Sequence, residues 1–268
     1  MRASFLPEIY LSIYLAGCYT CPSVKSQAAS GGAPSTSTME FKLWSLLLLI
    51  ADRGGLQSPA PGTQGYVLDA GANDGKSAQI LANAFKRLEL HVLAVEPLAS
   101  NVEVARRRAH GVRNLEVLHA GLGGFNGTVG HYPKALDQRR GNIGLQIASF
   151  RPEDNRGGAS YPIVTIDALF ATGSGRSLAL AHLDLEGNEA DALHGANATL
   201  MRDRPVLTVE TYPVFIPNQH RAVMAHLEDL QYDVYTVNES VGGIPDGRNR
   251  VAIPRENRHL HWIVNQWF

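Results

Sequence analysis

Two acidic residues stand where strand-like runs end. Asp69 closes the short apolar run that begins at Tyr66, and Glu96 follows the apolar run 90–95. The stretch from Asp69 to Gly75 then leads directly into a helical pattern. Glycines let the backbone approach a ligand without obstruction, and a helix start offers free amide groups. Because a carboxylate at the end of the second strand can accept both ribose hydroxyls, the pattern predicts a nucleoside-binding crevice.

The type of nucleoside cofactor follows from what the glycine stretch lacks. The dinucleotide fingerprint needs a middle glycine for close approach to pyrophosphate, and this chain has Ala72-Asn73-Asp74 between Gly71 and Gly75. Asp69 would also repel a phosphate. An acid beside the loop suits a cofactor that carries a positive charge, such as the sulfonium of S-adenosyl-L-methionine.

Alternating strands and helices must position these residues. Helical spacing of apolar residues predicts helices over 76–88 and 97–109, one through 190–200 and one around 223–230. The predicted strands are 66–69, 90–95, 115–118, 128–132, 164–166, 178–183, 206–209, 232–237 and 251–253. Strands that alternate with helices predict an α/β fold with a mostly parallel sheet and helices on both faces.

Composition limits the classes of protein that remain. The chain has 268 residues, 44% of them hydrophobic, which is too apolar for a disordered protein. The net charge of −1 gives no general attraction to nucleic acid or anionic lipid. Two cysteines cannot cross-link a chain of this length, so apolar burial must stabilise the core.

Three segments are predicted from the changes in composition. Residues 1–38 form a variable or disordered N-terminal segment, 39–64 a lead-in segment, and 65–268 the main domain. The apolar part of the lead-in segment is too short for a stable membrane span. It is either a helix packed on the domain or the apolar region of a secretory signal. The packed helix, and with it a cytoplasmic location, is favoured, and the secretory pathway or an organelle stays open.

The motifs taken together resemble the FkbM-type methyltransferases. The resemblance rests on Asp69 to Gly75, Val95-Glu96-Pro97, Val164 to Asp167, Leu183 to Glu189 and Pro205 to Glu210, and it spans residues 65–255. It implies the Rossmann-like class I methyltransferase fold, a mostly parallel seven-stranded sheet, with S-adenosyl-L-methionine as cofactor. The family often has Lys where this chain has His182, and an acid where it has Gly124.

The resemblance also implies roles for individual residues. The implied cofactor-binding residues are Asp69, Gly71, Ala72, Asn73, Gly75, Glu96, Gly121 and Leu122. The implied catalytic candidates are Asp184, Glu186, Glu210 and His182, any of which could accept the proton of an acceptor hydroxyl. Glu186 and Glu189 also suit a helix start, and His182 also suits a buried core position. No metal site is predicted, because no His pair stands beside these acids.

The expected function is O-methylation of a hydroxyl on a small molecule or glycan. Two alternatives stay open: an NAD-dependent oxidoreductase, and a non-catalytic cofactor-binding module. We expect no nucleic-acid partner, and the sequence does not give the oligomeric state or name the acceptor. The long stretch 133–161 is expected to help cover the acceptor site, because ligands bind beyond the carboxyl ends of parallel strands.

Overall fold

The computed structural model describes residues 41–56, 59, 61–130, 160–241 and 244–267. The predicted N-terminal segment 1–38 and nearly all of the stretch 133–161 lie outside these residues. The main sheet contains β1 (Gln64–Ala70), β2 (His91–Glu96), β3 (Leu115–His119), β7 (Arg176–Leu183), β8 (Val206–Glu210), β9 (Tyr232–Thr236) and β12 (Asn249–Pro254).

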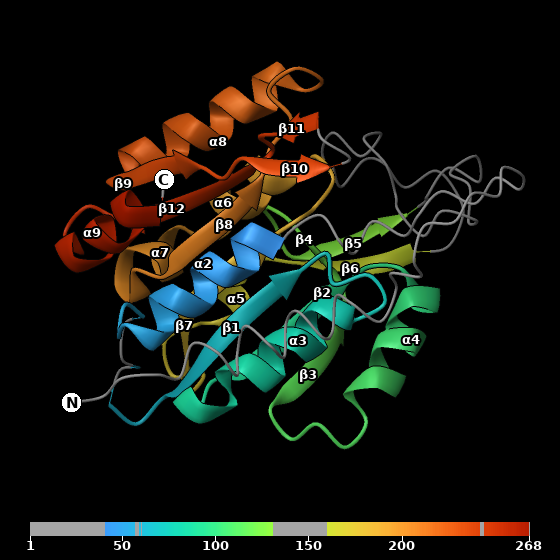
Figure 1. Ribbon diagram of the computed structural model, residues 1–268. Helices are drawn as coiled ribbons and strands as arrows, with labels where there is room; N and C mark the ends of the chain where they lie inside the picture. Colours follow the sequence, from blue (N-terminus) through green and yellow to red (C-terminus); the bar gives the residue numbers. More distant parts are fainter. Residues whose placement is uncertain (1–40, 57–58, 60, 131–159, 242–243, 268) are drawn as a thin grey trace, which may run out of the picture.

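The seven strands lie in the order β3-β2-β1-β7-β8-β12-β9 (Figure 1). Strands β3, β2, β1, β7 and β8 pair in parallel, whereas β12 is antiparallel to both β8 and β9. The predicted mostly parallel α/β sheet is therefore confirmed. The chain runs outward from β1 through β2 to β3, and later returns to β7 on the other side of β1, so the strand order reverses between β1 and β7.

Two smaller strand groups flank the main sheet. One is a three-stranded sheet of β4 (Gly121–Leu122), β5 (Gly127–Gly130) and β6 (Ser160–Val164), and the other is a hairpin of β10 (Glu239–Val241) and β11 (Ile244–Asp246). The predicted strand 164–166 was wrong beyond Val164. Thr165 there accepts a hydrogen bond from the amide of Ala168 at 3.1 Å and caps a short helix instead.

The helices are α2 (Phe41–Asp52), α3 (Lys76–Phe85), the 3₁₀ turn η2 (Lys86–Leu88), α4 (Ala99–Ala109), α5 (Ile166–Leu169), α6 (Glu189–His194), α7 (Asn197–Asp203), α8 (Pro217–Asp229) and α9 (Arg258–Trp267). The single helix predicted through 190–200 is split into α6 and α7. Gly195 separates them, and a Cβ at this position would lie 2.2 Å from the carbonyl oxygen of Gly123.

Each face of the main sheet is covered by its own apolar core. Helices α2, α3 and α9 pack on one face with Val67, while α5 to α8 pack on the other with Leu68 (Figure 1). Neighbouring residues of β1 enter opposite cores because side chains alternate along a strand. Both faces of the central strands are therefore apolar, which explains their near-continuous hydrophobic runs.

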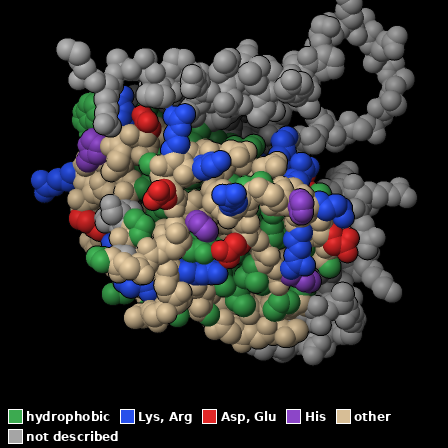
Figure 2. Space-filling model, turned by 90° about the horizontal axis from the view of Figure 1, so that it is seen from below, with side chains coloured by type: hydrophobic (Ala, Val, Ile, Leu, Met, Phe, Trp, Pro, Cys, Tyr) green, Lys and Arg blue, Asp and Glu red, His purple; other side chains and the backbone are tan. Residues whose placement is uncertain are grey.

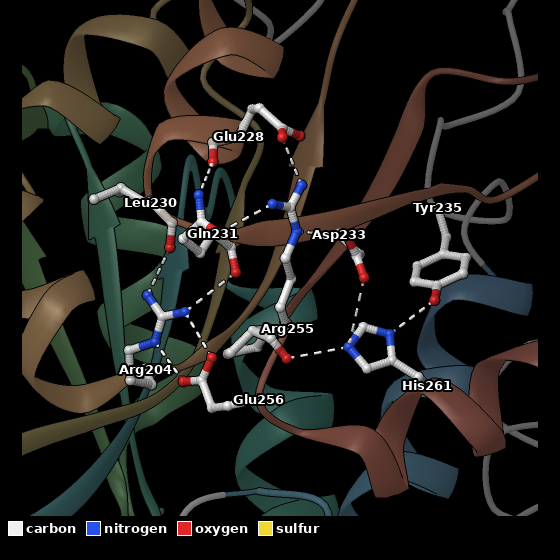
Figure 3. A network of polar contacts seen from close by, with 10 residues as sticks. Arg204, Glu228, Leu230, Gln231, Asp233, Tyr235, Arg255, Glu256 and His261 are labelled. Carbon is white, nitrogen blue, oxygen red and sulfur yellow. Dashed lines mark hydrogen bonds and ion pairs between the residues drawn. The ribbon is translucent and has the colours of Figure 1, made fainter.

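A polar network joins elements at the edge of the sheet where β9 begins and β12 ends (Figure 3). Arg255 bonds Glu228 of α8 at 2.6 Å and Asp233 of β9 at 2.8 Å. Arg204 bonds Glu256 at 2.6 Å. Since this is the edge at the amino ends of the parallel strands, the network braces the fold on the side opposite their carboxyl ends.

The surface carries charges of both signs. On the face shown in Figure 2, Lys and Arg side chains are interspersed with Asp and Glu. Such mixing is typical of a solvated surface. Among the described residues, none of the helices combines the length and hydropathy that a bilayer crossing requires.

Candidate active site

The predicted site residues gather at the carboxyl edge of the main sheet. Asp69 and Glu96 lie at the ends of β1 and β2, while Asp184 follows β7 and Glu210 ends β8. The strand order reverses between β1 and β7, and open α/β sheets bind ligands in the crevice at such a reversal. The topology therefore brings motifs that are far apart in the sequence to one edge.

The glycines after β1 allow close packing against protein backbone. Gly71 has a φ of +83°, and a Cβ there would lie 1.8 Å from the carbonyl oxygen of Asp184. Gly75 has a φ of +79°, and its Cβ would lie 2.8 Å from Cα of Ala105 in α4. Glycine at these two positions therefore lets the loop pack closely against the residue that follows β7 and against α4.

Asp69 orders the start of α3. Its side chain is 1% exposed, and its Oδ2 accepts a hydrogen bond from the Ser77 hydroxyl at 2.8 Å. Asp74 acts in the same loop, where its Oδ1 accepts the amide of Lys76 at 3.1 Å and its Oδ2 pairs with Arg108 of α4 at 2.7 Å. These carboxylates fix the loop between β1 and α3 by hydrogen bonds at both ends.

Glu96 connects this loop to the start of α4. Its carboxylate accepts the amides of Asn73 and Leu98, both at 2.9 Å, and the side-chain amide of Asn101 at 3.3 Å. The side chain is only 4% exposed. Burial raises the pKa of Glu96, although these hydrogen bonds act in the opposite direction. The structure thus places a buried carboxylate beside Asn73, surrounded by polar groups.

Ala72, Gly121 and Leu122 can offer a ligand only their backbone. The side chains of Ala72 and Leu122 are buried in the two apolar cores. The carbonyl oxygen of Leu122 accepts a hydrogen bond from Asn188 Nδ2 at 2.6 Å. This bond ties the segment after β3 to the turn that follows β7.

A cluster of acids and one tyrosine forms where β7 and β8 end. The Tyr212 hydroxyl donates to Glu210 Oε2 at 2.5 Å and to Glu186 Oε2 at 3.4 Å. Arg248 pairs with Glu210 Oε1 at 2.7 Å and lies over the Tyr212 ring, 5.5 Å from its centroid. Both oxygens of Glu210 are therefore engaged, and its charge is balanced by Arg248.

Glu186 differs from Glu210 in its surroundings. Burial first, and then the charge of Glu210, raise the pKa of Glu186. Burial and the charges of Glu210, Glu186 and Asp184 raise the pKa of Tyr212, so this phenol stays protonated. The backbone of Glu186 is in the left-handed region, with a φ of +52°. Strained backbone of this kind is concentrated at functional sites.

His182 lies below this cluster, within β7. Its side chain is 4% exposed, its Nδ1 contacts the Thr208 hydroxyl at 2.8 Å, and its ring packs against Trp44 of α2. Burial lowers the pKa of His182, which keeps the imidazole neutral, although the charges of Asp69 and Glu210 oppose this. The histidine is therefore part of the floor of the site.

Sequence reasoning missed Tyr212 and Arg248. Tyr212 stands two residues after Glu210, and apart from this nearness nothing in the sequence pattern indicates that it belongs to the site. Arg248 reaches Glu210 because β12 is antiparallel to β8, with Asn249 opposite Glu210. A short apolar run does not reveal strand direction, so this contact could not be read from the pattern. Within the ranges that the structure describes, no group of three or more His, Cys, Asp or Glu is arranged to hold a metal ion.

Comparisons with known proteins agree with this architecture. Among solved structures, the methyltransferase FkbM from Methylobacillus flagellatus KT matches with a TM-score of 0.50 and 15% identity, over 83% of this chain and 55% of that chain. The present chain thus spans about half the length of that protein. The sheet order and this match define a Rossmann-like class I methyltransferase fold, as predicted.

The family follows from the sequence match. Residues 69–234, more than half of the chain, match the family described as the methyltransferase FkbM domain. The chain belongs to the FkbM methyltransferase family, and the resemblance seen in its motifs is confirmed.

Two further solved structures match this chain with lower TM-scores. An O-methyltransferase from Bacillus cereus in complex with SAH matches with a TM-score of 0.40 and 14% identity, over 94% of this chain and 92% of that one. Fibrillarin from Aeropyrum pernix, with natively bound S-adenosyl-L-methionine, has a TM-score of 0.43 and 12% identity, over 79% of this chain and 73% of that one. A sequence search of curated proteins gives no significant match.

Proposed function

We propose that the protein is an S-adenosyl-L-methionine-dependent methyltransferase that methylates a hydroxyl oxygen of a small molecule or glycan. The observation that carries the proposal is the Glu96 carboxylate at the end of β2, hydrogen-bonded to Asn73 in the loop after β1, next to the strand-order reversal between β1 and β7. Membership of the FkbM family supports methyl transfer over the NAD-dependent alternative.

The residues present fit a cationic nucleoside cofactor. Asp69 and Glu96 place two buried carboxylates at the ends of neighbouring strands, and the pKa of Glu96 is raised by burial. Carboxylates in such a setting suit ribose hydroxyls and a sulfonium charge, and would oppose a pyrophosphate. We assign Glu96 to the ribose, Asp69 and the 71–75 loop to the methionine end, and the backbone at Gly121 and Leu122 to the adenine.

Glu186 is the residue to which we assign the acceptor's proton. Its pKa is raised, and its carboxylate accepts a long hydrogen bond from the Tyr212 hydroxyl at 3.4 Å. Glu210 is engaged by Arg248 and Tyr212, and His182 is buried below, so neither takes this role in the proposal. A positioned general base contributes typically about 100- to 10,000-fold to the rate.

The remaining residues of the site position the reacting groups and exclude water from them. When bound, the cofactor supplies an activated methyl group for the acceptor oxygen. Tyr212 and Arg248 hold Glu210 in place, so that Glu186 faces a fixed charge pattern. Aligning the acceptor hydroxyl can contribute about 7 to 11 kcal/mol when the geometry is ideal, and this is the main demand on the protein.

Calorimetry with purified protein tests the proposal. S-adenosyl-L-methionine and S-adenosylhomocysteine are expected to bind, and no binding at high micromolar concentration would contradict it. A tritiated-methyl transfer assay on metabolite and glycan extracts then identifies the acceptor. Binding without transfer to any fraction would support the non-catalytic module, and a change in nicotinamide fluorescence on mixing would support the oxidoreductase.

We also propose that the catalytic domain begins at α2 rather than at residue 65. Leu43, Leu46, Leu47 and Ile50 are fully buried in the core that α2 shares with α3 and α9. Fully burying a leucine-sized side chain contributes about 1.5 to 3 kcal/mol, so a domain without α2 would lose several of these contributions. Expression of residues 53–268 is expected to give an unstable protein.

A further inference from the structure

The turn between β7 and α6 carries Glu186 in an unfavourable backbone conformation. Glu186 has a φ of +52° and the next residue, Gly187, a φ of +111°. A residue other than glycine pays about 1 to 2 kcal/mol for the left-handed region. Such a conformation persists only where surrounding contacts determine it.

Glu189 supplies hydrogen bonds on both sides of Glu186. Its Oε1 accepts the amide of Leu185 at 2.8 Å and the amide of Gly187 at 3.2 Å. The side chain of Glu189 is fully buried, with 0% exposure. The two amides belong to the residues directly before and after Glu186, so one carboxylate oxygen fixes the peptide groups that flank it.

These contacts distinguish Glu189 from an ordinary helix-capping acid. Glu189 is the first residue of α6, where a carboxylate would favour the helix dipole. Besides its own amide, however, its carboxylate accepts the amides of Leu185 and Gly187, which precede the helix and lie in the turn. Burial raises the pKa of Glu189 to about 7, even though hydrogen bonds from the Gln219 side chain and from the amides of Glu189 itself, Gly187 and Leu185 act to lower it. A buried acid is therefore kept at a position where its charge is costly.

Helix α8 connects Glu189 to the second acid of the cluster. Gln219 donates its side-chain amide to Glu189 Oε2. The next residue, His220, contacts the Thr211 hydroxyl through Nδ1 at 3.2 Å, directly after Glu210 in the chain. Two neighbouring residues in the first turns of α8 thus brace the two segments that carry Glu186 and Glu210.

We propose that Glu189 is a positioning residue for methyl transfer, which holds the 185–187 turn so that the Glu186 carboxylate faces Tyr212. The inference rests on the proposed role of Glu186 as the base. It assigns Glu189 no contact with cofactor or acceptor. The function of Glu189 is to define where the neighbouring carboxylate lies.

The test compares Glu189→Ala, Glu189→Gln and Glu189→Asp in the full chain by NMR. The readouts are amide exchange at Leu185 and Gly187 and the pKa of the Glu186 carboxyl from its ¹³C shift. In Glu189→Ala, losing a hydrogen bond to a charged group should speed exchange of these amides by about tenfold or more. The pKa of Glu186 should fall toward its ordinary value of 4.5 as the turn relaxes into solvent.

Conservative variants separate positioning from general stability. Glu189→Gln keeps an acceptor oxygen at the same reach and should restore slow exchange and the raised Glu186 pKa. Glu189→Asp keeps the charge but is one methylene shorter, so it should behave like Glu189→Ala. The Gln and Asp variants decide the question if the Ala variant does not fold. The matched control is Gln219→Ala, which leaves both turn amides bonded and should leave their exchange within about twofold of wild type.

Two results would overturn the proposal. One is a Glu186 pKa that is the same in wild type, Glu189→Asp and Glu189→Ala. The other is equal amide exchange in all variants. Calorimetry with S-adenosylhomocysteine should give an unchanged affinity in Glu189→Gln and Glu189→Asp. A protein that binds no cofactor but shows the expected NMR changes would refute the proposed function and leave the role of Glu189 in the turn intact.

Discussion

The ring of Trp44 lies against the ring of His182, with 4.8 Å between the centroids and an angle of 60° between the planes. Trp44 belongs to α2 and His182 to β7, so the first described helix covers the strand that leads to Asp184. This contact seals the floor of the site on the face covered by α2. It also explains why the imidazole is buried and neutral.

Replacing Trp44 by Ala should open this floor. We expect a loss of about 2 kcal/mol in the free energy of unfolding, less than for a fully buried Trp because the side chain is partly exposed. The pKa of His182, lowered by burial, should rise toward its ordinary value of 6.5. Denaturant unfolding and an NMR titration of the imidazole measure the two effects. Trp262→Ala is the control, because that side chain is 57% exposed and should change stability little.

Gly71→Ala should disrupt the junction of β1 and β7. A Cβ would lie 1.8 Å from the Asp184 carbonyl oxygen, so we expect a loss of at least about 3 kcal/mol from overpacking and backbone strain. Gly173→Ala is a matched control. Gly173 has a φ of +86° but nothing within 4 Å of its Cβ position, so strain alone should cost about 1 kcal/mol. Equal losses in the two variants, measured by urea unfolding, would contradict the packing argument.

Glu96→Ala tests the proposed ribose contact. Losing a carboxylate that accepts hydroxyl donors should weaken S-adenosylhomocysteine binding by about tenfold or more. Calorimetry measures this directly. The control Glu103→Ala removes an exposed acid of α4 and should leave the affinity unchanged. An unaltered affinity in Glu96→Ala would remove Glu96 from the proposed site.

Glu186→Gln tests the assignment of the base. The transfer rate should fall by about 100- to 10,000-fold while cofactor affinity is kept. In the wild type the rate should rise with pH as Glu186 loses its proton, at a pH above its ordinary pKa of 4.5, because burial and Glu210 raise that pKa. Initial rates of tritiated-methyl transfer against pH measure both. A variant that retains the full rate and the same pH profile would refute the assignment.

Glu189→Gln should change how stability depends on pH. The pKa of Glu189 is about 7 in the folded protein against an ordinary 4.5, so the native state binds the extra proton between these values. Stability contributed by this proton is present below pH 4.5 and is lost as the pH rises to about 7, which corresponds to about 3 kcal/mol. The Gln variant lacks this loss, so its free energy of unfolding should increase relative to that of the wild type between pH 5 and pH 8. Urea unfolding of both proteins at pH 5 and at pH 8 measures this. If the difference in unfolding free energy between Glu189→Gln and the wild type is the same at both pH values, the expectation is contradicted.

The central sheet and its edge could be predicted because their determinants are local. Buried parallel strands give continuous apolar runs, and acids at the ends of β1, β2 and β8 mark the carboxyl edge. The motif order was enough to identify the family. Whether the predicted site residues bind cofactor or acceptor stays a prediction that the experiments above address.

Contacts between distant segments could not be predicted. Arg248 meets Glu210 only because β12 runs antiparallel, and Trp44 meets His182 only because α2 packs over β7. Helix α9 was missed because its apolar residues are mixed with Arg, His and Asn, although Leu260, Ile263 and Val264 are buried. The packing of Gly71 and Gly75 against Asp184 and Ala105 likewise joins segments that are far apart in the sequence.

The tight contact at Gly71 changes how the motif from Asp69 to Gly75 should be used when genomes are surveyed for related enzymes. Since a side chain at this position would push two central strands apart, selection for folding alone will retain the glycine. A relative that has lost activity is therefore expected to keep Gly71, and its presence says little about turnover. A relative's Glu96 and Glu186 positions are the more informative markers, because pseudoenzymes can lose either carboxylate without parting the strands.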